Sequence, residues 1–305
     1  MRHILDLSNQ PAKLRVKNQL LVIECKEGEV YTVPLAEVAV VILANPQISC
    51  TQAVLSGLAL AGAMLISCDQ RHLPVAMMMP LYGYHAPARR LIAQADATKP
   101  VCKRLWQRIV KAKIISQGML LAEVTGSDWG LLEMAESVRS GDPENLEAQA
   151  ARVYWGKLWN EKFVRNPDAE DQNRYLNYGY AILRAVVCRA ICAAGLHPGL
   201  GIHHHHRENA FCLADDLIEP LRPIVDRNVV EFVKQYGVNA PMNKVAKEHL
   251  LQIAEQRCWI EGENRSIFEV AEMMASSMAQ VFEGAREGMI LPDAKKSLVA
   301  PAKMA

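Results

Sequence analysis

The stretch "MMMPLYGYHAPARR", residues 77–90, separates two parts of the chain whose hydrophobic patterns differ. Proline and glycine punctuate it, which is typical of a connection and not of the interior of a helix or strand. Before this stretch the pattern fits short strands, and after it the pattern fits helices. The sequence therefore predicts an α+β protein in which an N-terminal β-rich domain is followed by a larger all-α domain.

The N-terminal part, residues 1–80, contains strand signals on both sides of a turn. In the segment 13–43, "KLRVKNQLLVIECKEGEVYTVPLAEVAVVIL", aliphatic and β-branched runs flank "KEGE" at 26–29, which indicates a hairpin. The next segment, 51–69, predicts a buried helix capped by Thr51 and then a short strand. We expect these elements to form one β-rich domain.

Beyond residue 90, apolar residues recur at spacings of three and four, the pattern of amphipathic helices. Gly195 and Gly237 directly follow two of these runs, where glycine commonly ends a helix. We expect a hinge at 81–92, a helical domain over 93–290 and a loose tail at 291–305. The helical runs are 103–124, 145–163, 172–195, 213–237 and 264–288.

The composition, with 305 residues of which 50% are hydrophobic, is that of a folded protein. Its eight cysteines include no CxxC pair, which argues against a zinc ribbon or a secreted disulfide framework and fits a reducing cytosol. The longest uncharged stretch, 38–68, is interrupted by polar residues, and the N-terminus shows no export signal. We therefore expect a cytoplasmic protein with no membrane contact.

The charge is nearly balanced, at a net +1, but it is unevenly distributed. Residues 79–113 contain eight basic residues and one acidic residue. Such a segment can neutralise several phosphates of a nucleic acid. The alternative, a solvated helix face, is the more common meaning of a lone basic run.

The stretch "GLGIHHHHRENAFCLADDLIEPLRP", residues 199–223, places four histidines before a group of acids. In an extended segment His204 and His206 point to one side and His203 and His205 to the other, so at most two of them can share a site. The pattern of the run alone does not select one of the four.

Acidic residues follow the histidines and also precede them by a long stretch of chain. On a helix that begins near Leu213, Asp216 and Glu219 share a face. Glu219 lies within an apolar run, where a carboxylate needs a partner or a metal. Glu147 opens an alanine-rich helix far upstream. For Asp216 and Glu147 a simpler explanation exists, because acids near a helix N-terminus stabilise the helix dipole.

Two carboxylates and one imidazole form an oxygen-rich ligand set that suits Mg²⁺ or Mn²⁺ better than Zn²⁺. Beside a basic surface, such an ion suits phosphodiester chemistry, because it polarises a phosphoryl oxygen and stabilises the leaving oxygen. The sequence contains no GxSxG elbow and no P-loop that would indicate another class of enzyme.

Longer motifs accompany these features and together identify a family. They are "KLRVKNQLLVI" at 13–23, the whole stretch 32–81, "LEAQAARVYW" at 146–155, "QNRYLNYGYAILRAVV" at 172–187, "GLHPGLGIHHHH" at 195–206, "LADDLIEPLRPIVD" at 213–226 and "NRSIFEVAE" at 264–272. In this order they resemble the CRISPR-associated integrase of spacer acquisition, the first-numbered and most widespread CRISPR-associated protein. The resemblance is strongest to the form found with type II systems and covers nearly the whole chain.

The resemblance implies a β-rich dimerisation domain, a hinge and a helical catalytic domain. It also implies a metal-dependent DNA integrase and endonuclease of antiviral defence, which joins the 3′-hydroxyl ends of a short DNA duplex to the CRISPR array by transesterification. The implied partners are double-stranded DNA, a second copy of the chain in a homodimer, and a smaller CRISPR-associated adaptation protein that forms a heterohexamer with two such dimers. The type II form adds the RNA-guided effector nuclease.

The family's metal ligands fall on Glu147, His204 and Glu219, which would hold Mn²⁺ or Mg²⁺. Asp216 would then be a supporting or alternate ligand. Because this chain presents four histidines where relatives often present one, His203 and His205 are the alternatives to His204.

The DNA-contacting residues are not fixed by a motif. We expect phosphate contacts, which position a substrate without reading its sequence, from the basic residues between the two domains and along the first long helix. These are Arg89, Arg90, Lys103, Arg104 and Lys111.

Two other functions compete with the integrase. One is a non-catalytic DNA-binding scaffold whose histidine and acid cluster is only structural, and the other is a cytosolic histidine-rich zinc protein. The zinc protein is disfavoured because the cysteines and histidines do not converge by spacing. A scaffold has no need of Glu147 and Glu219 together with His204, so this widely spaced set favours the enzyme.

Overall fold

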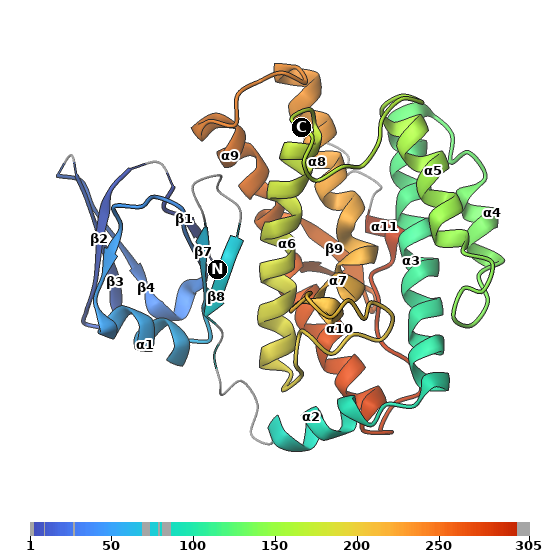
Figure 1. Ribbon diagram of the computed structural model, residues 1–305, viewed down its shortest axis with the longest axis horizontal. Helices are drawn as coiled ribbons and strands as arrows, with labels where there is room; N and C mark the ends of the chain where they lie inside the picture. Colours follow the sequence, from blue (N-terminus) through green and yellow to red (C-terminus); the bar gives the residue numbers. More distant parts are fainter. Residues whose placement is uncertain are drawn as a thin grey trace.

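The computed structural model describes residues 3–8, 10–26, 28–68, 74–78, 80 and 87–297, and it places a β-sheet region before a mostly helical region. Figure 1 shows the two four-stranded sheets and α1 (Gln52–Leu60) on one side of the molecule and the other helices on the opposite side, with α6 (Asn173–Ala193) beside the sheets. The predicted α+β class is confirmed.

The N-terminal region contains two four-stranded sheets. In the first, with the order β1-β5-β7-β8, the first three strands are parallel and β8 is antiparallel to its neighbour. The second has the order β4-β3-β2-β6, and its β3–β4 hairpin confirms the turn expected around "KEGE". The elements are β1 (His3–Asp6), β2 (Ala12–Lys17), β3 (Leu20–Cys25), β4 (Val30–Pro34), η1 (Leu35–Glu37), β5 (Val38–Leu43), β6 (Ser49–Cys50), α1 (Gln52–Leu60), β7 (Met64–Cys68) and β8 (Pro74–Met78).

Strand β5 joins the two regions because it is buried on both faces. Val41 packs in the core of the β region, together with Leu14 and Leu58. Val40 and Ile42 belong to the large core formed by the helices. A strand buried on both sides reads as a continuous apolar run, which explains the sequence "VAVVIL".

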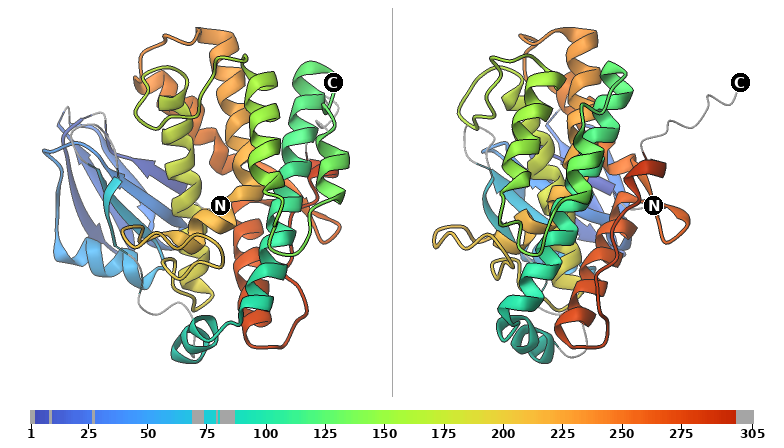
Figure 2. Two further views of the ribbon diagram at one scale, coloured as in Figure 1. Left: turned by 45° about the vertical axis from the view of Figure 1, so that its right-hand side comes forward. Right: turned by 90° about the vertical axis from the view of Figure 1, so that its right-hand side faces the viewer.

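The C-terminal region packs its helices around α6, which contacts α10, α8 and α7 (Figure 2). Gly179 permits this close packing, since a Cβ there would lie 2.5 Å from Val225. Its helices are α2 (Pro87–Ala95), α3 (Lys99–Thr125), α4 (Leu131–Glu136), α5 (Leu146–Leu158), α6, α7 (Cys212–Ile218), α8 (Arg222–Tyr236), α9 (Lys244–Leu251), α10 (Ile267–Phe282) and α11 (Ala294–Ser297), with short 3₁₀ turns η2 (Glu219–Leu221) and η3 (Gln252–Glu255).

Among the described residues, α6 is the helix long and apolar enough to cross a membrane by length and composition alone. In the structure 67% of this apolar window is buried, as it is in the core helix of a globular protein.

The C-terminal region is not all-α, and this corrects the sequence prediction. Strands β9 (Arg257–Ile260) and β10 (Glu263–Ser266) form an antiparallel hairpin. Glu261 and Gly262 both have positive φ in its two-residue turn, as tight hairpins require. The hairpin escaped prediction because its strands have four residues each and β10, "ENRS", is polar.

The predicted hinge and tail coincide only partly with described residues. Of the hinge, 81–86 lie outside the described part of the chain, and 87–92 belong to α2. Of the tail, Leu291 packs against the large core and α11 follows it, while 298–305 lie outside the described part. The domain boundaries themselves remain predictions.

Candidate metal centre

The histidine loop is held by one buried carboxylate. Asp216, which is 0% exposed, accepts hydrogen bonds from the backbone N–H groups of Ile202 (2.7 Å), His203 (3.1 Å) and His204 (3.2 Å). Its Oδ1 also lies 2.6 Å from Nδ1 of His204, and this hydrogen bond raises the pKa of the imidazole. Asp216 therefore fixes both the loop and the ring of one histidine.

Gly201 allows the loop to approach Asp216 this closely. A Cβ at this position would lie 2.4 Å from the carbonyl oxygen of His204 and 3.0 Å from Oδ2 of Asp216. Further back along the loop, Gln94 of α2 donates hydrogen bonds to the carbonyl oxygens of His197 (2.9 Å) and Leu200 (2.8 Å). Gly201 and Gln94 therefore fix the path of the loop backbone independently of the histidine side chains.

The four histidines have different surroundings. His203 stacks on Trp106 with ring centroids 4.0 Å apart, and its partial burial lowers its pKa. His205 and His206 are exposed and line a cleft, which His203 also lines. The expected strict alternation is wrong, because the segment is an irregular loop and not an extended strand. Among the four imidazole rings of the described loop, that of His204 alone is hydrogen-bonded to Asp216.

Glu147 is not needed to cap α5. Asp142 accepts hydrogen bonds from the N–H groups of Leu146 (2.9 Å) and Glu147 (3.0 Å), and Asn145 accepts one from Ala148 (3.3 Å). The carboxylate of Glu147 points instead at α3, where its Oε1 lies 2.7 Å from Nζ of Lys113.

Glu219 lies at the break between α7 and α8, where Pro220 follows it in η2. Its Oε1 pairs with Arg222 at 2.9 Å, and its Oε2 lies 2.6 Å from Nζ of Lys113. Burial alone would raise the pKa of Glu219, but Arg222 and Lys113 outweigh burial and lower it. Burial would lower the pKa of Lys113, yet Glu219 and Glu147 outweigh it and raise that pKa. Both groups are therefore charged at neutral pH.

The carboxylates thus meet on an ammonium group. No three His, Cys, Asp or Glu side chains within the described ranges converge closely enough to hold a metal ion. The contact of Oε2 of Glu219 with Lys113 is close but not aligned as a hydrogen bond, and this buried oxygen has no hydrogen-bond partner. An oxygen of this kind can accept a cation, and the donor set of two carboxylates and one imidazole fits a hard divalent ion.

A third buried carboxylate, that of Asp226, lies near the centre. Asp226 accepts hydrogen bonds from the hydroxyl groups of Tyr154 (2.6 Å) and Tyr180. Burial raises the pKa of Asp226 to about 6. The guanidinium of Arg222, which pairs with Glu219, lies over the ring of Tyr180, 4.8 Å from its centroid. Asp226 and the tyrosine bonded to it therefore support Arg222.

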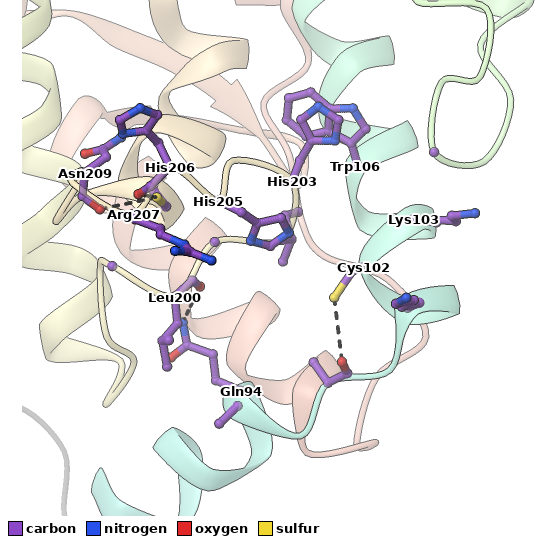
Figure 3. A pocket seen from close by; sticks show the side chains of 18 residues that line it. Gln94, Cys102, Lys103, Trp106, Leu200, His203, His205, His206, Arg207 and Asn209 are labelled. Atoms are coloured by element: carbon purple, nitrogen blue, oxygen red, sulfur yellow. Dashed lines mark hydrogen bonds between the residues drawn. The ribbon is translucent and has the colours of Figure 1, made fainter.

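A cleft of about 800 Å³ opens beside the centre, across Trp106 and His203. Figure 3 shows His205 and Arg207 from the loop and Lys103 from α3 around it. Its lining does not include Glu147, His204 or Glu219, so the cleft is adjacent to the candidate ligands and does not contain them.

The structure places the predicted DNA-contacting residues in different surroundings. Lys103 and Arg104 are exposed, Arg89 is exposed beside Glu283, and Lys111 pairs with Glu136. Arg90 is buried, donates to the carbonyl oxygen of Ala194 at 2.8 Å and lies 3.3 Å from Glu283. The expected DNA contact of Arg90 is therefore corrected, because its guanidinium anchors α2 to the helical core.

The family model that matches the chain is described as "CRISPR associated protein Cas1" and covers residues 5–262. The chain belongs to the Cas1 family. This confirms the predicted function class, the CRISPR-associated endonucleases and integrases of spacer acquisition, whose members are generally metal-dependent.

Two curated Cas1 proteins illustrate the similarity. The CRISPR-associated endonuclease Cas1 of Neisseria meningitidis serogroup C (strain 8013) is 40% identical over 268 residues, which is 87% of each chain. A CRISPR-associated endonuclease Cas1 of Pyrobaculum aerophilum is 30% identical over 238 residues, covering 73% of this chain and 80% of the relative.

Solved structures share the fold at low sequence identity. A Cas1 protein from Thermotoga maritima has a TM-score of 0.75 at 16% identity and covers 93% of this chain and 98% of its own. A casposase bound to an integration product has a TM-score of 0.80 at 17% identity, and the match covers 99% of this chain and 96% of the casposase chain. A chain of a Cas6-RT-Cas1–Cas2 complex has a TM-score of 0.73 at 15% identity, and the match covers 93% of this chain and 35% of that one.

Sequence reasoning missed the residue on which the carboxylates of this Cas1 protein meet. Lys113 was counted only as one basic residue of a segment. Its position contained the signal, because it shares the apolar face of α3 with Trp106, Val110 and Leu120 at helical spacings. A lysine on a buried face needs an anionic partner.

Proposed function

We propose that this Cas1 protein is a metal-dependent DNA integrase and endonuclease in which Glu147, His204 and Glu219 hold Mn²⁺ or Mg²⁺. The observation that carries the proposal is the hydrogen bond of His204 to buried Asp216, beside two carboxylates that share one cation. When bound, the ion would polarise a phosphoryl oxygen and ease ionisation of an attacking hydroxyl group.

The protein side chains orient the ligands. Since Nδ1 of His204 is engaged by Asp216, Nε2 is the nitrogen left for a metal, the arrangement found when a carboxylate orients a ligating histidine. Arg222 holds one oxygen of Glu219 and leaves the other for a cation. Asp216 is saturated by hydrogen bonds and supports His204, so we assign it a positioning role and not that of a ligand.

The substrate is DNA. The 3′-hydroxyl end of a short duplex attacks a phosphodiester bond of the CRISPR array, so that one P–O bond forms and another breaks. Lys103 and Arg207 line the cleft beside the centre and supply phosphate contacts, and the exposed Arg89 and Arg104 and the partly exposed Lys111 supply further ones. Binding that depends on such contacts weakens steeply as salt rises.

The partners follow from the same proposal. They are double-stranded DNA, a second copy of the chain bound through the β region, a smaller CRISPR-associated adaptation protein in a heterohexamer, and the RNA-guided effector nuclease. The likeness in fold to a chain of a complex that contains Cas1 and Cas2 supports the smaller partner. The site of action is the cytoplasm of a prokaryote, where the array lies.

The experiment measures joining of a 3′-hydroxyl duplex to a plasmid with a leader and repeat, in Mn²⁺ and with the small partner. Glu147→Gln and Glu219→Gln each reduce joining by at least about a hundredfold, because loss even of a group that only supports a metal ligand costs about 10–100-fold. DNA affinity stays near that of the wild type. Glu144→Gln, which alters a nearby acid paired with Arg139, is the matched control and keeps its activity.

The scaffold hypothesis predicts a different result. If the wild type binds DNA but joins none in Mn²⁺ or Mg²⁺, the catalytic proposal is wrong and the scaffold is favoured.

A further inference from the structure

Lys113 lies at the point where the two proposed carboxylate ligands meet. Its side chain leaves the buried face of α3, is 10% exposed and reaches both Glu147 (2.7 Å) and Glu219 (2.6 Å). These acids come from different elements, α5 and the turn η2. A single ammonium group therefore connects three segments that are distant in the sequence.

The two contacts of Glu219 are not equivalent. Arg222 follows it at i+3, so this pair is local to one turn of the chain, and the guanidinium also rests on the ring of Tyr180. Lys113 reaches the other oxygen through a flexible four-carbon chain, and the alignment of that contact is poor. Displacing Arg222 from Glu219 would also break its contact with the ring of Tyr180, whereas displacing Lys113 would break no such ring contact. Of the two cations, Lys113 is therefore the one that a metal ion can displace.

An ammonium and a divalent cation cannot both occupy the space between the same carboxylate oxygens. At such separations like charges repel strongly in a partly buried site. Without either cation, the two carboxylates would repel each other in the same way. The structure thus shows a charge-balanced arrangement that depends on one positive group between Glu147 and Glu219.

We propose that Lys113 is an internal cation that holds Glu147 and Glu219 together in the metal-free protein and competes with the divalent ion for them. This inference rests on the proposed function, because it takes these two residues as metal ligands. An interaction made only in the metal-free state weakens metal binding by its own free energy. Lys113 therefore sets the affinity of the centre for its metal and keeps it folded before the metal arrives.

The test measures Mn²⁺ affinity by isothermal titration calorimetry without DNA, and the melting temperature in EDTA and in Mn²⁺. Lys113→Met tightens Mn²⁺ binding by at least about tenfold, which corresponds to about 1.4 kcal/mol. It also lowers the melting temperature in EDTA and enlarges the rise caused by Mn²⁺. Lys113→Gln removes the charge but keeps an NH₂ donor group, so it changes the Mn²⁺ affinity and the melting temperatures in the same directions by smaller amounts. It replaces the Met variant if that variant does not fold.

Lys244→Met is the control. Lys244 has no assigned role in metal or DNA binding and pairs with Glu248 at the surface of α9, where ion pairs contribute little. This variant keeps the Mn²⁺ affinity of the wild type and its melting temperatures.

The failures of the two proposals can be told apart. If Lys113→Met binds Mn²⁺ no more tightly than the wild type, while Glu147→Gln weakens binding, Lys113 does not compete and the inference is wrong although the metal site stands. If Glu147→Gln leaves the Mn²⁺ affinity of the wild type unchanged, the proposed metal site is wrong and the inference falls with it.

Discussion

The two sides of the candidate metal centre are held in place by opposite means. On the histidine side, a buried carboxylate, Asp216, collects three backbone N–H groups and the ring of His204. On the carboxylate side, one buried ammonium, that of Lys113, collects Glu147 and Glu219. The first side depends on the backbone and is complete without a metal, whereas the second depends on a side chain that a metal would have to replace. The histidine side is therefore positioned by the fold itself, whereas the final arrangement of the carboxylate side depends on which cation lies between Glu147 and Glu219.

Among the residues that support the ligands without binding the metal, the largest expected effect comes from breaking the histidine side. Asp216→Asn leaves at least one donor facing the new amide NH₂, so the loop and the ring of His204 lose their common support. We expect Mn²⁺ affinity to fall about 10–100-fold, the usual cost of losing a group that orients a metal ligand. The free energy of unfolding falls by about 1–3 kcal/mol, the cost of leaving a buried polar group unpaired.

Calorimetric titration and urea unfolding measure these two effects. Asp215→Asn is the control, because Asp215 precedes Asp216 but pairs with Arg184 and Asn209. Equal losses of Mn²⁺ affinity in both variants would contradict the special role of Asp216.

A smaller effect tests the support of the carboxylate side. The pKa of Asp226 is raised to about 6 in the folded protein from an ordinary value of 3.8, so the folded state binds this proton more tightly than the unfolded chain. The resulting stabilisation is fully present below about pH 4 and is lost as the pH rises through about 6. Relative to Asp226→Asn, the wild type should gain about 1 kcal/mol of unfolding free energy between pH 7 and pH 5.

Urea unfolding of the two proteins at both pH values measures this gain as a difference, so that groups titrating alike in both proteins cancel. An identical pH dependence of wild type and variant would show that Asp226 is ionised throughout this range.

Much of the fold could be predicted from the hydrophobic pattern. The long helices α6 and α10 lie within the periodic runs, and α3 extends its run by four residues at the N-terminal end and one at the C-terminal end. Gly195 and Gly237 end their helices with positive φ as expected. Strand order could not be predicted, because the parallel pairing of β1 with β5 depends on contacts between segments more than thirty residues apart. The hairpin β9–β10 was missed because short polar strands leave no periodic signal.

The candidate site could be predicted in its residues but not in its connections. The acids stood out by their chemistry, and the family resemblance selected His204 from the four histidines. Asp216 accepts backbone hydrogen bonds because the loop folds closely around Gly201. The spacing of residues in the sequence does not reveal this loop conformation. That Lys113 joins the two carboxylates depends on the packing of α3 against α5 and η2, which is a tertiary contact.

The most direct test of the account compares His204→Ala with His205→Ala and His206→Ala in Mn²⁺-dependent joining of a 3′-hydroxyl duplex to a leader-repeat plasmid. The account predicts that His204→Ala loses at least about a hundredfold in joining rate, as a metal ligand should. The two exposed neighbours should change by less than about threefold, the scale of a surface substitution. Full joining by His204→Ala, or equal losses at all three positions, would contradict the claim that one histidine of the run, fixed by Asp216, completes the metal centre.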